Sequence, residues 1–467
     1  MSPANPSKAY TRSLTPLERR FFRAPNSFVI LIVQIKGAID PEKLRVAVNA
    51  VQKRHRLLQC RTLVDDKGNV SFTTENVQGI QVTATVRHTA DQWLQEALDM
   101  QKTPFRITEQ PPIIFKLLQG EDRSDLIICC HHMICDGLSL TYMARDIFEC
   151  LAHPDREIAL LPDPKPATRA NIDAAVQLAP DWASRIQDAN KAWEKQKVSF
   201  SEADYLELFD AYWKHYTFDA RSIELSRSQT SRLLNRCRRE QVTANTGLLA
   251  LLLHTQYQVQ GDDAAYLRRT GVAVSTRNFL LHPPGEAFGL YAAGAMFDFP
   301  CNTGNSLWDF ARKLHQQIGD STSKENILTG LASADAIDPT LLDAVQIKRF
   351  GHLIDPRASG HQKISEFCER EDVISAMERN RAKNAKRGVL LTNLARIDSF
   401  PNEGGLEVEK LFIYPGASDI FEKAFGALTF KGSLTLLISY IRECIDEETV
   451  SKFVATFEQT LKKELDL

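Results

Sequence analysis

The sequence predicts an α/β (α+β) fold of two lobes, each a mixed sheet with flanking helices. Short apolar segments alternate with amphipathic ones in both halves of the chain, as strands and helices do. Between the halves, residues 153–170 contain four prolines and no clean hydrophobic period, which is typical of a connector. We therefore expect an N-terminal lobe over residues 1–165 and a C-terminal lobe, with linker and crossover segments, over residues 166–467.

The N-terminal half opens on Thr15-Pro16-Leu17-Glu18, a capping box with proline at the first helical position, which predicts a helix start. A second pair, Thr89 with Gln92, predicts a helix through about Gln101. Apolar residues at helical spacing predict further helices over residues 41–55 and from Gly137 through Leu151. Strand patterns occupy residues 27–35, 59–64, 70–74, 81–86, 113–118 and 126–132.

The C-terminal half repeats this alternation. Residues 243–259 predict a strongly apolar helix, buried on most sides, that ends near Gly261. Lys431-Gly432-Ser433 separates two strand patterns and predicts a hairpin. The remaining predicted helices are 229–240, 306–318 and 447–464, and the predicted strands are 222–225, 272–277, 293–299, 389–394, 428–430 and 434–440.

The composition is that of an ordinary globular protein. The 467 residues are 43% hydrophobic and 25% charged, and the formal net charge is only −2. This balance disfavours nucleic-acid binding and attraction to anionic membranes. No stretch approaches the apolar length of a membrane span, and the first thirty residues lack the apolar core of a secretory signal. We expect a cytoplasmic monomer.

The residues that carry chemistry are His131-His132-Met133-Ile134-Cys135-Asp136-Gly137, at the end of an apolar strand. Successive strand residues face opposite sides, so one histidine of the pair is expected to face a cavity. A histidine there can accept a proton from an alcohol or amine at neutral pH. Asp136 can hold the turn or the ring, and Gly137 permits a close approach. Taken alone, the pattern fits a buried, hydrogen-bonded histidine pair equally well.

A metal site in this region is disfavoured. Cys129, Cys130 and Cys135 surround the two histidines, but adjacent strand residues point in opposite directions and cannot easily share a metal. The nine cysteines of the chain form no CxxC pair, which is typical of reduced, buried thiols. We expect no metal.

The motif HHxxxDG, with Ser139 following, resembles the signature of the CoA-dependent acyltransferase superfamily. That superfamily includes chloramphenicol acetyltransferase, nonribosomal peptide condensation domains and alcohol acetyltransferases. Further segments resemble its alcohol acetyltransferase and polyketide-associated branch, in the same order along the chain. They are residues 12–18, residues 54–58 with arginine in place of the usual proline, residues 240–245, residues 271–277 (GVAVSTR) and residues 392–394 (TNL).

The resemblance implies two chloramphenicol acetyltransferase-like lobes with an active-site tunnel between them. His132 and Asp136 are then the catalytic pair: His132 is the base, and Asp136 acts structurally through an ion pair with Arg277. His131 and Gly137 support them. The co-substrate is an acyl-CoA or phosphopantetheine thioester, and no cofactor is bound permanently. No GxSxG motif suggests a covalent acyl-enzyme.

Departures from the pattern concern the second lobe. Thr392 and Ala395 replace the serine and glycine of an SNLG element, Leu290 stands where asparagine is frequent, and no DFGWG element is evident. Asn393 could donate to the oxyanion of the reaction or cap a turn. Tyr291 could line the tunnel or pack in the core. The basic run of Arg379, Arg381, Lys383, Lys386 and Arg387 could bind phosphates or an acidic carrier, or form a solvated face.

The function we expect is transfer of an acyl group from a thioester to the hydroxyl of a small-molecule acceptor, in secondary or lipid metabolism. An acyl carrier protein of a polyketide synthase is a further expected partner. Amide formation and a repurposed cyclase or isomerase acting on a bound polyketide are the alternatives within the enzyme class. The alternative from another class is a non-catalytic module that docks carrier proteins.

Overall fold

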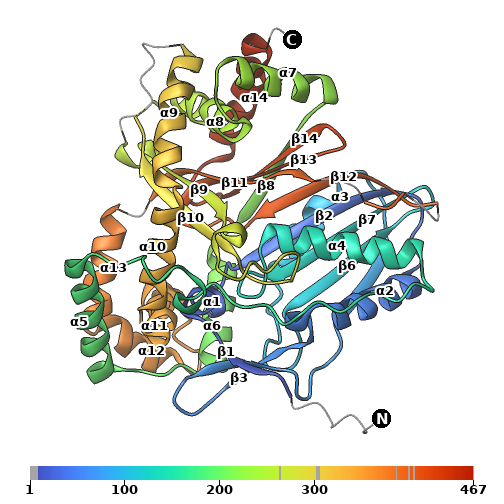
Figure 1. Ribbon diagram of the computed structural model, residues 1–467. Helices are drawn as coiled ribbons and strands as arrows, with labels where there is room; N and C mark the ends of the chain where they lie inside the picture. The colour runs from blue at the N-terminus through green and yellow to red at the C-terminus, as the bar shows by residue number, and fades with distance from the viewer. Residues whose placement is uncertain are drawn as a thin grey trace.

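A computed structural model describes residues 9–261, 264–300, 306–384, 386–397, 400–402 and 405–465. Two large sheets dominate it (Figure 1). The five-stranded sheet has the order β12-β2-β7-β6-β5, and the six-stranded sheet has the order β10-β9-β11-β13-β14-β8. A small sheet of order β1-β4-β3 lies at the edge of the first lobe. Both large sheets are mixed, since β5–β6, β9–β11 and β11–β13 pair in parallel and the other pairs are antiparallel.

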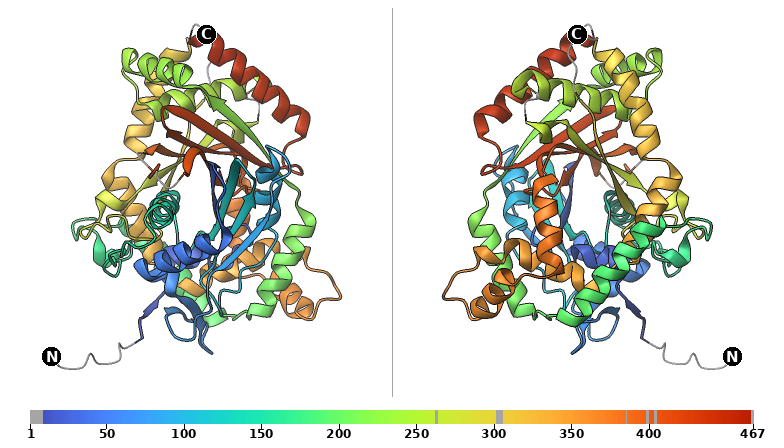
Figure 2. Two further views of the ribbon diagram at one scale, coloured as in Figure 1. Left: turned by 90° about the vertical axis from the view of Figure 1, so that its right-hand side faces the viewer. Right: turned by 90° about the vertical axis from the view of Figure 1, so that its left-hand side faces the viewer.

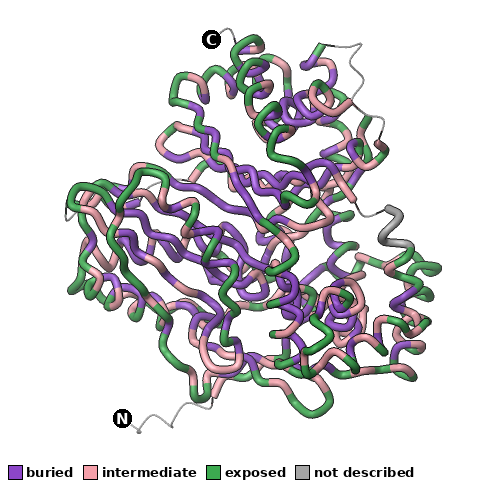
Figure 3. Tube along the Cα trace, turned by 180° about the vertical axis from the view of Figure 1, so that it is seen from behind, coloured by how far each residue is buried: buried purple, intermediate pink, exposed green. Residues whose placement is uncertain are grey.

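The central strands of the five-stranded sheet are buried on both faces, whereas its edge strand β5 is mostly exposed (Figure 3). Its strands are β2 (Phe28–Lys36), β5 (Gln81–Val86), β6 (Ile113–Gln119), β7 (Arg123–His131) and β12 (Glu407–Pro415). Helices α2 (Pro41–Arg54) and α4 (Gly137–Ala152) lie side by side on one face, and α3 (Gln92–Met100) lies on the other (Figures 1 and 2). This double cover explains why all residues of β7 after Arg123 are buried.

The six-stranded sheet carries its helices on one face (Figure 1). Helix α8 (Ala244–Gln260) packs among α7 (Arg227–Arg239), α9 (Leu307–Ser321) and α14 (Glu447–Glu464), so its apolar residues are buried on most sides, as the sequence predicted. The strands of this sheet are β8 (Phe218–Leu225), β9 (Arg269–Ser275), β10 (Ala292–Asp298), β11 (Arg387–Ile397), β13 (Phe421–Phe430) and β14 (Ser433–Ile441). The β13–β14 turn has positive φ at Lys431 and Gly432, as a two-residue hairpin requires.

A cluster of helices that the sequence did not predict lies beside both sheets (Figure 1, lower left). Only α1 (Pro16–Phe22) was expected there. The others are α5 (Pro180–Gln196), α6 (Glu202–His215), α10 (Lys324–Asp335), α11 (Pro339–Phe350), α12 (His361–Glu369) and α13 (Val373–Asn384). Helix α11 packs against α1, α6, α12 and α13, which gives the cluster its own centre.

Strand β12 joins the two halves of the chain. It follows β11 in the sequence but pairs antiparallel with β2, from Glu407 opposite Lys36 to Pro415 opposite Val29. The second half thereby supplies the outer strand of the first lobe's sheet. A boundary between lobes near residue 165 stays a prediction.

One local prediction was wrong, and one predicted strand starts two residues later than expected. Thr89 does not cap α3: the helix follows Asp91, and the side chain of Gln92 accepts from the backbone N–H of His88 instead. The predicted strand over residues 59–64 is shorter, because Arg56–Gln59 form a 3₁₀ turn and β3 (Arg61–Val64) starts after it. β4 (Val70–Thr73), β1 (Thr11–Ser13) and β3 complete the small sheet. No helix in the described part of the chain is long and apolar enough to cross a membrane.

Candidate active site

His132 follows β7 directly, in the turn that leads into α4. Its backbone N–H donates to the carbonyl of Ser27 at 2.9 Å, which continues the pairing of β7 with β2. Phe21 of α1 stacks on its ring, with centroids 4.4 Å apart and planes 25° apart. The side chain is half-buried, whereas His131 is buried. The backbone of His132 is therefore fixed by Ser27 and its ring by Phe21, and the side chain is still reachable by solvent.

The tautomer of His132 follows from its hydrogen bond. Nδ1 lies 2.8 Å from the carbonyl oxygen of Cys135. A carbonyl oxygen can only accept, so Nδ1 carries the ring proton. In the neutral ring the lone pair then belongs to Nε2, which is the arrangement a general base requires.

The surroundings of His132 favour the neutral ring. Burial lowers the pKa of His132 below its ordinary value, and the charge of Arg20 lowers it further. The Cys135 carbonyl and the charge of Asp136 act in the opposite direction, but burial is the largest effect. The ring is thus unprotonated at neutral pH and free to accept a proton.

His131 has a structural environment. Its Nδ1 accepts from the backbone N–H of Met133 at 3.3 Å, and its ring packs edge-on against Phe28 and Phe105. Burial lowers the pKa of His131 to about 3, with a further contribution from His132. Of the two histidines, His132 alone combines solvent access with a free nitrogen, as the alternation along the strand led us to expect.

Asp136 is the N-cap of α4 and is saturated with partners. Its Oδ1 accepts from the backbone N–H of Ser139 at 2.7 Å, and its Oδ2 accepts from the backbone N–H of Tyr291 at 3.0 Å. Nη2 of Arg277 lies 3.2 Å and 3.4 Å from the two oxygens. The predicted ion pair is present, and the carboxylate positions backbone groups of two segments.

Arg277 connects the lobes. It follows β9, and its Nη2 also donates to Oγ of Ser139 on α4 at 2.7 Å. Its Nη1 donates to the carbonyls of Gly285 and Ala287, and its guanidinium lies 4.7 Å from the ring centroid of Tyr291. We call the contact of Arg277 with Asp136 and Ser139 the interlobe ion pair.

Gly137 lies at a second contact between the lobes. A Cβ added there would come within 2.7 Å of Cδ2 of Leu394 on β11. The absence of a side chain therefore lets the first turn of α4 approach β11 closely.

The second-lobe candidates have structural partners. Asn393 accepts the backbone N–H of Ala395 at 2.8 Å and donates to Asn245 at 3.3 Å, so it shapes a turn inside β11. Ala395 has a φ of 59°, the left-handed region that favours glycine, which explains why its replacement of glycine is a departure. Tyr291 is buried and donates to the carbonyl of Lys165, so it packs in the core.

The three members of the predicted basic run whose side chains are described have different environments. Arg379 on α13 pairs with Glu371, whereas Nζ of Lys386 lies 4.2 Å from the ring centroid of Tyr266. Burial lowers the pKa of Arg387 at the start of β11. The side chains of Arg381 and Lys383 lie outside the described residues.

Sequence reasoning missed three residues of the site: Arg20, Phe21 and the bridging role of Ser139. The opening segment predicted α1 but gave no signal that its Phe21 would contact His132, more than a hundred residues away. Ser139 also donates to the carbonyl of Gly289 at 2.7 Å. The one sequence signal for this bridging role is the position of Ser139, two residues after the motif.

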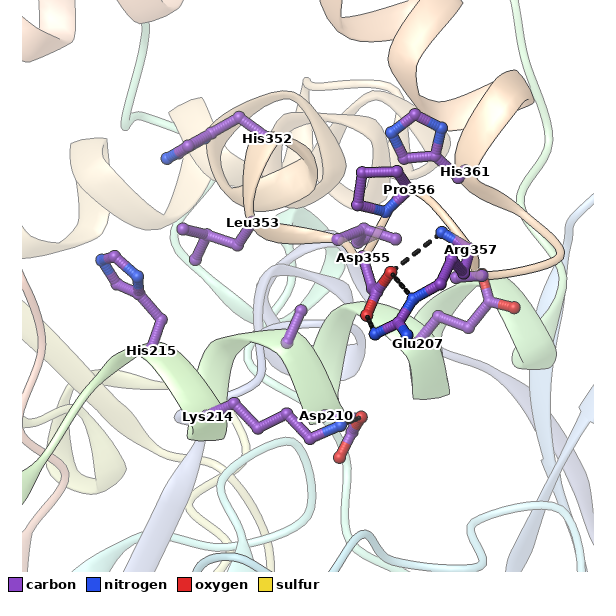
Figure 4. A pocket seen from close by; sticks show the side chains of 13 residues that line it. Glu207, Asp210, Lys214, His215, His352, Leu353, Asp355, Pro356, Arg357 and His361 are labelled. Atoms are coloured by element: carbon purple, nitrogen blue, oxygen red, sulfur yellow. Dashed lines mark hydrogen bonds and ion pairs between the residues drawn. The ribbon is translucent and has the colours of Figure 1, made fainter.

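Two other features of the described residues were compared with this site: possible metal ligands and a surface hollow. The described residues contain no group of three or more His, Cys, Asp or Glu side chains that could hold a metal ion. A hollow of about 710 Å³ lies between α6 and α12 (Figure 4), and His132 is not among the residues that line it. Its acidic groups already have partners, Asp355 with Arg357 and Asp210 with Lys214.

The family model described as "Condensation domain" matches residues 21–278, which include the histidine motif, the connector and Arg277. The chain belongs to the condensation-domain family. Among curated condensation-domain relatives, cyclosporin synthetase simA of Tolypocladium inflatum is 22% identical over 93% of this chain. The beauvericin nonribosomal cyclodepsipeptide synthetase of Beauveria bassiana is 25% identical over 53% of it. The chain spans only 3% and 8% of the lengths of these two synthetases.

Solved structures share the condensation-domain fold over the whole chain. The trichothecene 15-O-acetyltransferase TRI3 of Fusarium sporotrichioides has a TM-score of 0.66 at 11% identity and covers 99% of this chain and 97% of its own. Polyketide synthase associated protein 5 of Mycobacterium tuberculosis has a TM-score of 0.60 at 15% identity and covers 98% of both chains. The predicted fold class, two lobes of the chloramphenicol acetyltransferase and condensation type, is confirmed.

Proposed function

We propose that this protein transfers an acyl group from a CoA or carrier-protein thioester to a hydroxyl group, with His132 as general base. The observation that carries the proposal is the hydrogen bond from Nδ1 of His132 to the Cys135 carbonyl, because it leaves Nε2 as the proton acceptor of a solvent-reachable ring. Membership of the condensation-domain family supports the same reaction class.

The proposed reaction needs no covalent intermediate with the protein. Nε2 of His132 takes the proton of the acceptor hydroxyl as its oxygen attacks the thioester carbonyl carbon. The tetrahedral intermediate collapses, the carbon–sulfur bond breaks, and the thiolate takes the proton back from Nε2. Asp136 and Arg277 keep α4 and its preceding turn in place and take no part in the proton transfer. An active-site tunnel between the lobes, with the thioester and the acceptor entering from opposite ends, belongs to this proposal.

Amide formation is the second candidate. It uses the same base and the same donor with an amine as acceptor. The similarity to cyclosporin synthetase simA over nearly the whole chain favours it. The similarity in fold to a 15-O-acetyltransferase over the whole chain, and the lack of a DFGWG element, favour the ester.

The first test measures thiol release from a panel of acyl-CoAs, with and without alcohols and amines. The wild type is compared with His132→Ala and with His352→Ala, a surface control in the hollow of Figure 4. We expect an alcohol to accelerate thiol release, His132→Ala to lose about 10²- to 10⁴-fold in rate, and the control to match the wild type. Equal activity of His132→Ala and the wild type would remove His132 from the mechanism. Acceleration by amines alone would select the second candidate.

A second experiment separates the two donors. If acyl-CoAs release no thiol, the same acyl groups are offered on the phosphopantetheine arm of an acyl carrier protein. Transfer from the carrier should weaken steeply as salt rises, because docking to an acidic carrier depends on charge. Carrier binding without transfer would identify a docking module that is not an enzyme.

A further inference from the structure

Arg20 is a cation beside the proposed base without a partner of its own. It lies on α1 next to Phe21, the residue whose ring stacks on His132. Its side chain is exposed to solvent, yet the surrounding atoms and the charge of Arg349 lower its pKa. Arg20 therefore reaches solvent from a helix whose next residue contacts the proposed base.

The carboxylates that bind the neighbouring arginines are already paired. Glu18 binds Arg12, Asp343 binds Arg19, and Asp419 binds Arg349. Arg20 itself makes no hydrogen bond or ion pair with any residue that the structure describes. The other arginines of this short segment are all engaged, since Arg23 also donates to the carbonyl of Phe200.

The charge of Arg20 is felt at the ring of His132. A positive charge there disfavours protonation of the base, so it does not assist proton transfer from the acceptor. A solvent-reachable arginine without a counter-charge among the described residues is available to an anionic ligand. Guanidinium groups fit carboxylates through two parallel hydrogen bonds.

We propose that Arg20 is a specificity-determining residue that binds a carboxylate on the substrate reacting at His132. The inference rests on the proposed function and narrows its substrate class to acyl groups or acceptors with an anionic end. The phosphate of a pantetheine arm is a poor candidate, because it lies at the far end of the arm from the thioester that His132 must reach.

The test uses pairs of substrates that differ only in this charge. The donor pairs are succinyl-CoA with butyryl-CoA and glutaryl-CoA with valeryl-CoA, in which the phosphates of CoA are common to both members. The acceptor pairs are ω-hydroxy acids of increasing length, each with its primary amide. The proteins are the wild type, Arg20→Gln, Arg20→Lys and the control Arg45→Gln, a half-buried arginine on α2 that pairs with Glu42.

We expect the wild type to prefer the anionic member in one of the two series, which names the side that carries the carboxylate. Arg20→Gln should reduce kcat/KM for that member about ten- to a hundredfold and leave its neutral partner nearly unchanged. Arg20→Lys should keep part of the preference, and Arg45→Gln all of it. Equal losses on both members of each pair, or no anionic preference in either series, would overturn the proposal.

Binding separates this inference from the proposed reaction. In a His132→Ala background no turnover is required, and calorimetry compares the same pairs with and without Arg20→Gln. An anionic preference that disappears with Arg20→Gln supports carboxylate binding even where the wild type transfers no acyl group. Transfer of neutral acyl groups by the wild type without any anionic preference would refute the role of Arg20 and leave the proposed function standing.

Discussion

At the scale of single residues, His132 and His131 show how position along one strand separates two roles. They are neighbours in sequence, but β7 directs one ring among Phe28 and Phe105 and the other towards solvent and Phe21. His131 is kept neutral by burial, and His132 is kept neutral while its Nε2 stays available. The pair therefore contains one structural and one reactive ring.

The pH dependence of the reaction should reflect this environment. Only the neutral ring of His132 accepts a proton, so the rate should rise with pH through the pKa of His132 and then level off. Because burial lowers that pKa, the midpoint of the acidic limb of kcat/KM should lie below about 6.5, the ordinary value of histidine. Arg20→Gln removes a contribution that lowers the pKa, so its midpoint should move upwards. A midpoint above the ordinary value would contradict the desolvated base.

The sequence predicted part of the site and missed the rest for a physical reason. Local pattern or resemblance predicted the motif and the ion pair of Asp136 with Arg277. It also predicted that the cysteines around the motif are buried thiols. Phe21 contacts His132, and the charge of Arg20 acts on it, only because α1 docks nearby, and docking depends on side chains far apart in the chain. Asn393 and Tyr291 also depend on such contacts, and the structure gives both of them structural partners.

At the scale of elements, the segment β7–turn–α4 is the unit that presents the base. Asp136 caps α4, and Arg277 holds that cap from the other lobe. Arg54 and His55, at the end of α2, both contact Asp146 in the second half of α4. These contacts fix the helix at a second point. The position of His132 thus depends on a helix secured at two points.

Loss of the interlobe ion pair should cost far more than loss of an ordinary helix cap. Asp136→Ala leaves the guanidinium of Arg277, only 5% exposed, without its counter-charge, and we expect a loss of about 3–5 kcal/mol in unfolding free energy. The control Ser306→Ala removes the exposed cap of α9 and should cost about 1 kcal/mol. Urea denaturation measures the unfolding free energy of both variants. Equal losses would show that the ion pair adds nothing beyond capping.

Gly137 should be sensitive to a single methyl group. In Gly137→Ala the new Cβ meets Leu394, and we expect destabilisation of about 1–3 kcal/mol. Leu394→Ala in the same chain should recover part of this loss, since it removes the group that collides. Gly330→Ala on α10 is the control, because a Cβ there meets nothing within 4 Å. Strict additivity of the two substitutions in denaturation measurements would contradict the contact.

Elements with a strong pattern were predictable, and the helical cluster was not. The apolar strands, α8 and α14 carry clear periodicities, and α14 spans the predicted residues 447–464. The helices α10 to α13 mix small, polar and charged residues on their packed faces, and α11 even buries Asp343 against Arg19. Such helices are stabilised by tertiary partners more than by their own pattern.

At the scale of the whole molecule, the lobes share structure in both directions. Strand β12 crosses to the first lobe's sheet, and the interlobe ion pair crosses at the motif. The five-stranded sheet and the helical cluster also share one continuous core. Neither half of the chain therefore has a complete sheet and core without the other.

The first 165 residues alone should fail to form a stable domain. Without β12, strand β2 lacks an antiparallel partner on one side, and its buried residues from Phe28 to Val33 meet solvent at that edge. We expect this fragment to bind a hydrophobic dye and to unfold without a cooperative transition, whereas the full chain unfolds in one. Near- and far-ultraviolet circular dichroism follow the unfolding of the fragment and of the full chain. A cooperative transition of the fragment would show that β12 is dispensable.

The position of β12 also has a consequence for biosynthesis. The ribosome releases β2, β6 and β7 early, but the strand that completes their sheet emerges only after most of the chain has been made. Throughout that interval the nascent chain carries an apolar sheet edge that can pair with a neighbouring chain. Expression hosts that translate slowly or lack chaperone capacity should therefore yield aggregates of incomplete chains, even though the finished protein has that edge covered.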